Sequence, residues 1–326
     1  MIVRITRTLL VLQLLVACAI AATMIKVFHF DKPVVAMIIG LGAVLLVRMQ
    51  ITANNFILSS RYSSVTPDAC RLSRWQSCKL FLYEFRSTMT ASSYTMPFHA
   101  FTKRVAENPS ALPVLLIHGY GCNSGYWHMM SKQLAHAQIT HYAVNMEPVM
   151  GDIDDYVPVV HEGVEAMCKE TRSDKIIIVA HSMGGLAARA YLRAHGSARI
   201  AKVITLGTPH HGTGVANFGA GTNCQQMRWT VDEGEGASSE WLRQLDAGET
   251  ADDRKLLVSI FSHHDNIISP QTSSFLPGAT NIEFHGVGHV ALAFSPRVQA
   301  RVIAEIREAS RAPAAAPSSA TASPLS

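Results

Sequence analysis

The sequence predicts an α/β fold with a mostly parallel central sheet and helices on both faces, preceded by N-terminal membrane helices. From residue 111 onward, short β-branched runs alternate with longer amphipathic runs, as is typical of parallel sheets with crossover helices. Residues 1–60 instead contain two long apolar runs. At 326 residues, 48% of them hydrophobic, the chain is long enough for one large α/β domain plus an appendage, or for two smaller domains.

Residues 1–60 are predicted to form a hydrophobic helical hairpin that serves as a membrane anchor. Thr8–Phe28 carries no charge except Lys26, and its 21 residues would cross a hydrocarbon core of about 30 Å as a helix. Pro33–Val47 is a second run of 15 uncharged residues. It is short for a span unless the flanking basic side chains reach the headgroups. The connector between the runs is brief, which favours a hairpin.

Two other interpretations of the first run stay open. Arg4 and Arg7, followed by an apolar stretch and Ala19-Ile20-Ala21, are also compatible with a cleavable signal peptide. Leu15-Val16-Ala17-Cys18 resembles a lipoprotein-processing site with Cys18 as the acylated residue. The apolar run continues past both points, which favours an uncleaved anchor. The distribution of basic residues slightly favours both termini in the cytoplasm; if one run alone spans, the remainder lies on the other side.

The charge distribution indicates a membrane surface as a partner. Residues 1–110 carry 12 Lys and Arg against 4 Asp and Glu, whereas residues 111–326 carry 16 against 20. A basic, apolar N-terminal third is typical of membrane association. Nucleic acid is disfavoured because the basic residues lie beside apolar runs rather than in an aromatic-rich RNA-binding motif. The six cysteines show no metal-ligand spacing, so we predict no metal site, and no obligate protein partner is inferred.

Residues 61–110 are predicted to be a basic amphipathic connecting segment. Thr66-Pro67-Asp68 resembles a helix start. Apolar residues then recur every three or four positions from Leu72 to Phe85, with basic residues between them. The helix is expected either to lie on anionic lipid or to pack on the following domain, and the pattern does not separate these hypotheses.

Residues 111–308 are predicted to be the α/β domain. About 50 residues separate two of its strands, and this length predicts a cap-like insertion at about 213–250; a packed pair of surface helices is the alternative. Residues 309–326 are rich in Ala, Pro and Ser and are predicted to be a disordered tail. The expected strands are Val114–Ile117, Lys175–Val179, Lys202–Leu206 and Leu256–Phe261, and the expected helices are Asp155–Glu170, Met183–His195 and Pro296–Glu308.

Ser182 is the candidate nucleophile. A buried apolar strand leads directly into Ala180-His181-Ser182-Met183-Gly184, and a helix follows. A serine on such a sharp strand-to-helix turn is pushed out of the sheet, and only small residues two positions away on either side avoid a clash. The turn also places the Met183 amide at a helix N-terminus, where N–H groups favour an oxyanion.

A second strand-to-turn motif is predicted to complete the oxyanion hole. Val114–Ile117 is followed by His118-Gly119-Tyr120-Gly121, and such a turn can supply the other backbone donor. We expect the N–H groups of Tyr120 and Met183 to form the oxyanion hole. His118 is expected to be a structural histidine that holds this loop.

The base and the acid are expected after the serine, in the order Ser, acid, His. His289 lies in a glycine-rich loop after a strand end and is the candidate base, with His285 as its local competitor. Asp265 follows the strand ending at Phe261 and is the candidate acid, which would hold the His289 tautomer. His210 and His211 follow another strand and are expected in a wall of the site.

These motifs together resemble the bacterial lipases and esterases of the α/β-hydrolase fold, with an A-x-S-x-G serine motif. The motifs that carry the resemblance are His118-Gly119, Ala180–Gly185, the Asp265 loop and His285–His289, and the resemblance covers roughly residues 111–308. It implies hydrolysis of carboxylic esters, with lipid or other esters as substrates, through an acyl-enzyme and without a cofactor. An acyltransferase or a thioesterase using the same triad is the alternative. With the predicted anchor, we expect a bacterial inner-membrane protein.

Overall fold

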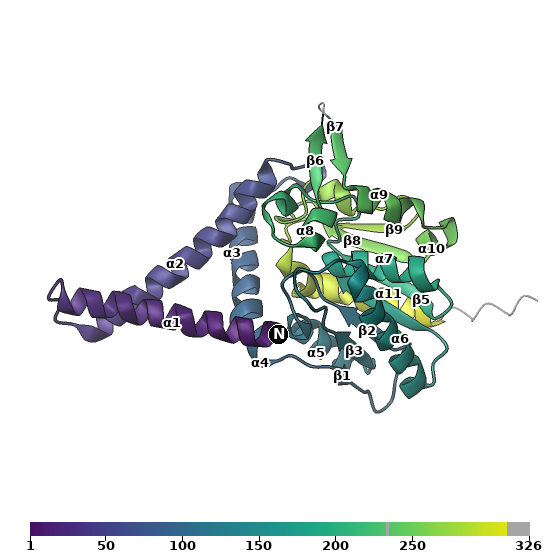
Figure 1. Ribbon diagram of the computed structural model, residues 1–326, viewed down its shortest axis with the longest axis horizontal. Helices are drawn as coiled ribbons and strands as arrows, with labels where there is room; N and C mark the ends of the chain where they lie inside the picture. The colour runs from purple at the N-terminus through teal and green to yellow at the C-terminus, as the bar shows by residue number, and fades with distance from the viewer. Residues whose placement is uncertain (233–234, 312–326) are drawn as a thin grey trace, which may run out of the picture.

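A seven-stranded sheet forms the centre of the computed structural model, which describes residues 1–232 and 235–311 (Figure 1). The strand order is β1-β3-β2-β4-β5-β8-β9, and every neighbouring pair is parallel except β1 and β3. Its strands are β1 (Lys103–Arg104), β2 (Val114–Ile117), β3 (His141–Val144), β4 (Ile176–His181), β5 (Ile200–Leu206), β8 (Leu257–Ser262) and β9 (Thr280–Phe284).

Helices cover both faces of this sheet, as predicted. Alternate residues of β2 belong to different cores, since successive side chains of a strand point to opposite faces. Leu115 and Ile117 pack in the core that contains residues of α6 and α7, whereas Val114 and Leu116 pack in the core with α5 and α11. The helices of this domain are α5 (His128–His136), α6 (Val157–Thr171), α7 (Met183–His195), α8 (Thr222–Gln226), α9 (Glu240–Ala247), α10 (Ala251–Lys255) and α11 (Pro296–Arg311).

The predicted elements agree with these bounds within about two residues, except at the end of α11, and the structure adds strands and helices for which no bounds were predicted. β3 was not predicted, because its sequence His141-Tyr142-Ala143-Val144 is not an apolar run. The strand end expected before His289 is the end of β9, for which no bounds were predicted, and the two-residue β1 was not assigned as a strand. Helix α11 continues to Arg311, so residues 309–311 of the predicted disordered tail are helical, and residues 312–326 lie outside the described residues.

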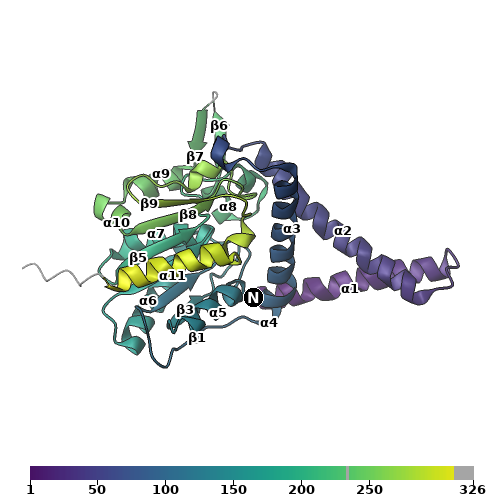
Figure 2. The same ribbon diagram turned by 180° about the vertical axis from the view of Figure 1, so that it is seen from behind.

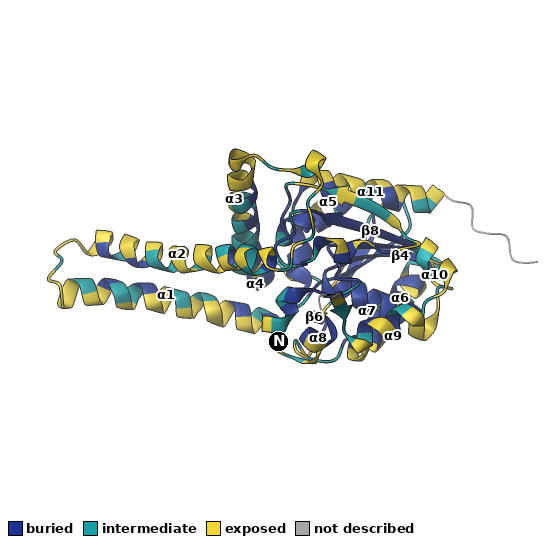
Figure 3. Ribbon diagram, turned by 90° about the horizontal axis from the view of Figure 1, so that it is seen from above, coloured by how far each residue is buried: buried dark blue, intermediate teal, exposed yellow. Residues whose placement is uncertain are grey.

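The N-terminal hairpin consists of α1 (Ile2–Lys26) and α2 (Pro33–Ser60), which project from the sheet domain side by side (Figures 1 and 3). Both helices are long and apolar enough to cross a membrane, and most of their residues are exposed. The expectation of a short second run was wrong, because α2 continues through Arg48. That guanidinium is hydrogen-bonded to Gln13 of α1 at 3.0 Å and to Ser93 at 2.7 Å.

Helix α3 (Arg74–Thr90) crosses the base of the hairpin and lies between it and the sheet domain (Figure 2). It begins later than predicted, because Ser73 and Gln76 form a capping box there, while Asp68–Cys70 is a separate 3-10 turn. Its buried residues are Leu80, Glu84 and Ser87 rather than the predicted apolar set. The chain continues through a π-turn, η2 (Ala91–Thr95), into the short α4 (Met96–Phe98).

The insertion at 213–250 contains α8, α9 and an antiparallel hairpin of β6 (Trp229–Asp232) and β7 (Glu235–Ser238). Leu242 and Leu245 of α9 are buried in the same core as α7. The β6–β7 hairpin protrudes from the domain (Figure 1). The insertion therefore packs on the sheet domain through its helices.

Candidate active site

Ser182 occupies a strained turn between β4 and α7. Its φ of 54° and ψ of −128° are unusual for a residue with a side chain, at a cost of about 1–3 kcal/mol. Two hydrogen bonds hold the turn: the Ser182 N–H donates to the Leu206 carbonyl at 2.9 Å, and the Thr208 hydroxyl donates to the Ser182 carbonyl at 2.9 Å. The surrounding backbone therefore fixes where this serine leaves the sheet.

Glycine is required after this turn, at position 184, and in the loop after β2, at position 119. A Cβ on Gly184 would lie 2.5 Å from the carbonyl oxygens of both Ile117 and His118. A Cβ on Gly119 would lie 2.9 Å from the Cβ of Ser182. The loop after β2 thus packs directly against the serine, as the two motifs predict.

Asp265 and His289 form a buried hydrogen-bonded pair. His289 Nδ1 lies 2.8 Å from Asp265 Oδ2, and Asp265 Oδ1 accepts the N–H groups of Ile267 and Ile268 at 2.8 and 2.7 Å. These bonds orient the carboxylate so that Nδ1–H donates to it and Nε2 is left as the acceptor. Burial lowers the pKa of His289, but the Asp265 and Glu84 carboxylates outweigh it, and its pKa is raised from 6.5.

The structure brings Ser182, Asp265 and His289 to the carboxyl end of the sheet. A Cβ on Gly207, the residue after β5, would lie 3.0 Å from Asp265 Oδ2 and 3.3 Å from His289 Nδ1. The His181 ring lies 4.5 Å from the His289 ring, centroid to centroid. Ser182 and His289 both line one cavity of about 300 Å³. The predicted triad residues thus lie together, although 107 positions separate Ser182 from His289 in the chain.

The two predicted oxyanion donors flank the same serine. Tyr120 lines the cavity beside Ser182, and Met183 is the first residue of α7. Within residues 1–232 and 235–311, neither backbone N–H donates a hydrogen bond. Among the described residues, both N–H groups therefore remain available as hydrogen-bond donors beside Ser182.

The other histidines occupy different places. His118 is buried, and its Nε2 accepts the Met146 N–H at 3.2 Å while Nδ1 contacts the Gly119 carbonyl at 2.9 Å. Burial lowers the pKa of His118 to about 4, in keeping with a structural role. The expectation that His210 and His211 form a wall of the site was wrong: neither lines the cavity, and His210 lies 3.4 Å from Arg189 Nη1. His285 lines a different cavity.

Glu84 is a site residue that the sequence interpretation missed. It extends from α3, is 1% exposed, and accepts the N–H groups of Val290 and Ala291, both at 2.9 Å. Burial raises the pKa of Glu84 to about 7, against the lowering effect of these two hydrogen bonds. The available signal was that Glu84 is the sole acidic residue of an otherwise basic helix.

The N-terminal segment also forms part of the cavity wall. Thr88, Ala91, Ser92 and Met96, from α3, η2 and α4, line it together with Tyr126 and Ile267 of the sheet domain. No described residue of the 213–250 insertion lines this cavity. Residues of segment 61–110, which was predicted to be a connecting segment, therefore line this cavity, whereas the described residues of the predicted cap-like insertion do not.

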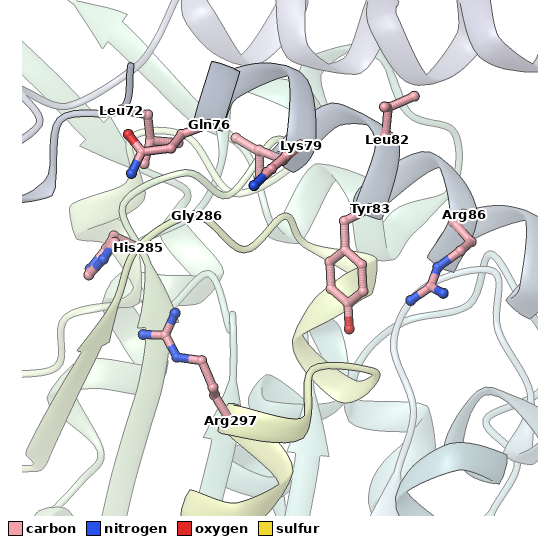
Figure 4. Close-up of a pocket in the computed structure, with 10 residues that line it drawn as sticks. Leu72, Gln76, Lys79, Leu82, Tyr83, Arg86, His285, Gly286 and Arg297 are labelled. Atoms are coloured by element: carbon pink, nitrogen blue, oxygen red, sulfur yellow. The ribbon is translucent and has the colours of Figure 1, made fainter. Parts of the chain in front are cut away.

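A larger cavity, of about 580 Å³, lies beside α3 and does not contain the serine (Figure 4). Its lining includes Lys79, Arg86 and Arg297, and Figure 4 shows their side chains around Tyr83 and His285. Neither Ser182 nor His289 contributes to it. The larger cavity is therefore not the candidate active site, which is instead the smaller cavity that Ser182 and His289 line.

Comparisons with known proteins agree with this architecture. The model of the palmitoyl protein thioesterase family matches residues 113–247. A lipase from Bacillus licheniformis in its mature form is 18% identical with a TM-score of 0.51, over 64% of this chain and 97% of that chain. Its propeptide form is 17% identical with a TM-score of 0.53, over 64% of this chain and 53% of that chain.

A fungal lipase gives the same result. Lipase B from Aspergillus fumigatus is 17% identical with a TM-score of 0.51, over 62% of this chain and 55% of that chain. At such identities the likeness concerns the fold. The chain therefore belongs to the α/β-hydrolase fold, and within it resembles the bacterial lipases and esterases.

Proposed function

We propose that this protein is a membrane-anchored serine hydrolase that cleaves carboxylic esters through an acyl-enzyme. The observation that carries the proposal is the buried Asp265–His289 pair, 2.8 Å apart, beside a strained Ser182 that lines the same cavity as His289. Activation of a serine by a base that a third group orients is the general arrangement for nucleophilic catalysis.

The proposed reaction uses the groups already described. Ser182 Oγ attacks the ester carbonyl carbon while His289 Nε2 takes the hydroxyl proton. The N–H groups of Tyr120 and Met183 donate to the oxyanion of the tetrahedral intermediate, a contribution of about 3–4 kcal/mol for each such donor. The intermediate collapses, and the alcohol leaves with the proton from His289. Water activated by His289 then releases the carboxylic acid and restores the serine.

Thioester hydrolysis is the second candidate. The match to the palmitoyl protein thioesterase family over residues 113–247 favours it, and that region contains Ser182 and Tyr120. The same steps apply, with a thiol as the leaving group. Much of the cavity lining is apolar, including Ala91, Met96 and Ile267, which favours an acyl chain in either substrate.

The preference between esters and thioesters can be measured directly. Full-length protein is assayed with p-nitrophenyl esters from acetate to palmitate and with the matching acyl thioesters. We expect turnover of esters, with kcat/KM rising with chain length as apolar surface is buried. Preference for thioesters at equal chain length would favour the second candidate. Turnover of neither class would contradict both.

We further propose that the α1–α2 hairpin crosses the membrane and is retained. Its apolar side chains are exposed, and its helices approach closely, because a Cβ on Gly40 would lie 2.3 Å from the Ala17 carbonyl oxygen. Small residues at such contacts are typical of membrane helix pairs. Ile2 is buried, and Arg7 Nε donates to the Pro97 carbonyl at 2.9 Å. Contacts between the start of α1 and α4 favour an anchor over a removable signal peptide.

Helix α3 is proposed to lie at the membrane surface beside this hairpin. Its Trp75 and Leu82 are 66% and 53% exposed, and Lys79 and Arg86 form no ion pair with the described carboxylates. An apolar and basic exposed face suits an anionic lipid surface. The expectation of lipid contact and the expectation of packing on the domain are thus compatible, since opposite sides of α3 serve each.

Membrane insertion predicts a specific fractionation result. Full-length protein expressed in a bacterial host is expected to sediment with the inner membrane and to stay there after washing with alkaline carbonate, which strips peripheral proteins. Its mass should include residues 1–60. Release by the wash, or a mass lacking the first helix, would contradict the proposed anchor.

A further inference from the structure

We infer that Glu84 is a positioning residue for His289, which makes the N-terminal segment part of the catalytic apparatus. The inference rests on the proposed function, since it concerns the base of that reaction. It assigns Glu84 no contact with substrate: the carboxylate acts on the loop that carries the histidine and on the charge that the imidazole gains.

Glu84 accepts hydrogen bonds from the two residues that follow His289. One carboxylate oxygen accepts the Val290 N–H and the other accepts the Ala291 N–H, each at 2.9 Å. The loop is shaped to admit the carboxylate, because a Cβ on Gly288 would lie 2.5 Å from Glu84 Oε2. Charge-assisted bonds of this kind are about twice as strong as neutral ones.

The other anchors of this loop come from the sheet domain. The His289 N–H donates to Asn266 Oδ1 at 3.0 Å, and His181 Nε2 lies 3.1 Å from the His289 carbonyl. The Tyr126 hydroxyl donates to the Val290 carbonyl at 3.1 Å. Among the described side chains that hydrogen-bond to residues 289–291, Glu84 alone belongs to the N-terminal segment. The position of His289 therefore depends on the packing of α3 against the sheet domain.

Glu84 also acts on His289 through charge. The titratable groups around the carboxylate are Asp265, His289 and Tyr126 from the sheet domain and Tyr83 from α3, and His181 also faces the imidazole. The Glu84 charge raises the pKa of His289, as Asp265 does more strongly. Burial raises the pKa of Glu84 to about 7, and the charge of each group acts on the titration of the other.

Through Glu84, helix α3 connects the α1–α2 hairpin to the loop that carries His289. Glu84 belongs to α3, which precedes the sheet domain in the chain. α3 also contacts the hairpin, since Phe56 of α2 and Phe81 of α3 have ring centroids 6.0 Å apart. Helix α3 therefore contacts both the proposed membrane hairpin and the loop that carries the catalytic base.

Glu84→Gln in the full-length protein tests the inference. The amide cannot accept both N–H groups with carboxylate strength and carries no charge. We expect kcat to fall about 10- to 100-fold, the range for loss of a charged hydrogen bond, with KM nearly unchanged. His289 must be neutral to act as base, and losing the Glu84 charge lowers its pKa. The acidic limb of the pH–kcat/KM profile should therefore move to lower pH and titrate as one group.

Two further variants complete the experiment. Glu107→Gln removes an exposed carboxylate and should change neither kcat nor the profile. Glu84→Asp keeps the charge but is too short to reach both N–H groups, so we expect an intermediate kcat with an acidic limb near that of wild type. It also decides the question if Glu84→Gln does not fold, in which case wild-type kcat in Glu84→Asp would overturn the inference.

The failure of this inference differs from failure of the proposed function. Wild-type kcat and pH profile in folded Glu84→Gln would overturn the role of Glu84 and leave the serine mechanism intact. A lower kcat with an unmoved acidic limb would also overturn it, since loss of packing alone gives that result. Full activity of a Ser182 variant would instead refute the serine mechanism itself.

Discussion

Replacing Ser182 with alanine is expected to abolish ester turnover. The substitution removes the atom that forms the acyl-enzyme, and losses of about 10⁴-fold or more in kcat follow loss of a triad nucleophile. The fold should persist, because the hydrogen bonds that hold this turn use the backbone N–H and carbonyl of residue 182. Steady-state kinetics and circular dichroism on the same preparation measure the two effects.

Ser77→Ala is the matched control for this experiment. Ser77 is exposed on α3, so its loss should leave both kcat and the melting temperature unchanged. Appreciable ester hydrolysis by a pure, folded Ser182→Ala preparation would contradict the assignment of the nucleophile.

Replacing Asp265 with asparagine is expected to reduce kcat by about 10⁴-fold, as loss of a triad carboxylate does. The amide is nearly isosteric, but it removes the charge that stabilises the imidazolium and favours the wrong tautomer of His289. Because Asp265 helps to raise the pKa of His289, the acidic limb of any residual activity should move to lower pH. A pH–kcat/KM profile of the purified variant measures both changes.

Asp252 and Asp253 supply the comparison. Both lie in α10 before β8, at the opposite end of that strand from Asp265. Their asparagine variants should retain wild-type kcat. If either is more damaging than Asp265→Asn, the choice of the acid is incorrect.

The triad candidates could be predicted from the sequence because each depends on a local pattern. Ser182, Asp265 and His289 each follow the end of a parallel strand, and the carboxyl ends of such strands meet at one edge of the sheet. An apolar run followed by a turn marks that position without any knowledge of the rest of the fold. Strand β3 shows the limit, since a four-residue sequence that begins with His141 has no clear strand pattern of its own and forms the strand by pairing with β2.

Glu84 and the wall of the cavity could not be predicted in this way. Glu84 meets Val290 across 206 positions of sequence, and no local pattern reports a contact of that kind. The length of the 213–250 insertion predicted a cap, but docking of α3 and the π-turn against the site decides which side chains line the cavity. Tertiary contacts, rather than segment length, select the segment that covers a site.

The start of α3 and the length of α2 show competition between local signals. Thr66-Pro67 resembles a helix start but yields only the 3-10 turn at Asp68–Cys70, whereas the reciprocal bonds of Ser73 and Gln76 start the helix. In α2, the charge of Arg48 predicts the end of the apolar run. The helix continues past Arg48 because its guanidinium is hydrogen-bonded to polar side chains of α1 and η2. Those partners lie on other segments, so the sequence of α2 alone does not reveal them.

The most direct test of the central claim is the site at which a fluorophosphonate reacts, because this reagent phosphonylates only a serine that a neighbouring base activates. Full-length protein is treated with the reagent, digested, and analysed by mass spectrometry. The account predicts one adduct per chain, on the hydroxyl of Ser182, and a lower labelling rate in Asp265→Asn. An unlabelled folded protein, or an adduct on another residue that persists in Ser182→Ala, would contradict it.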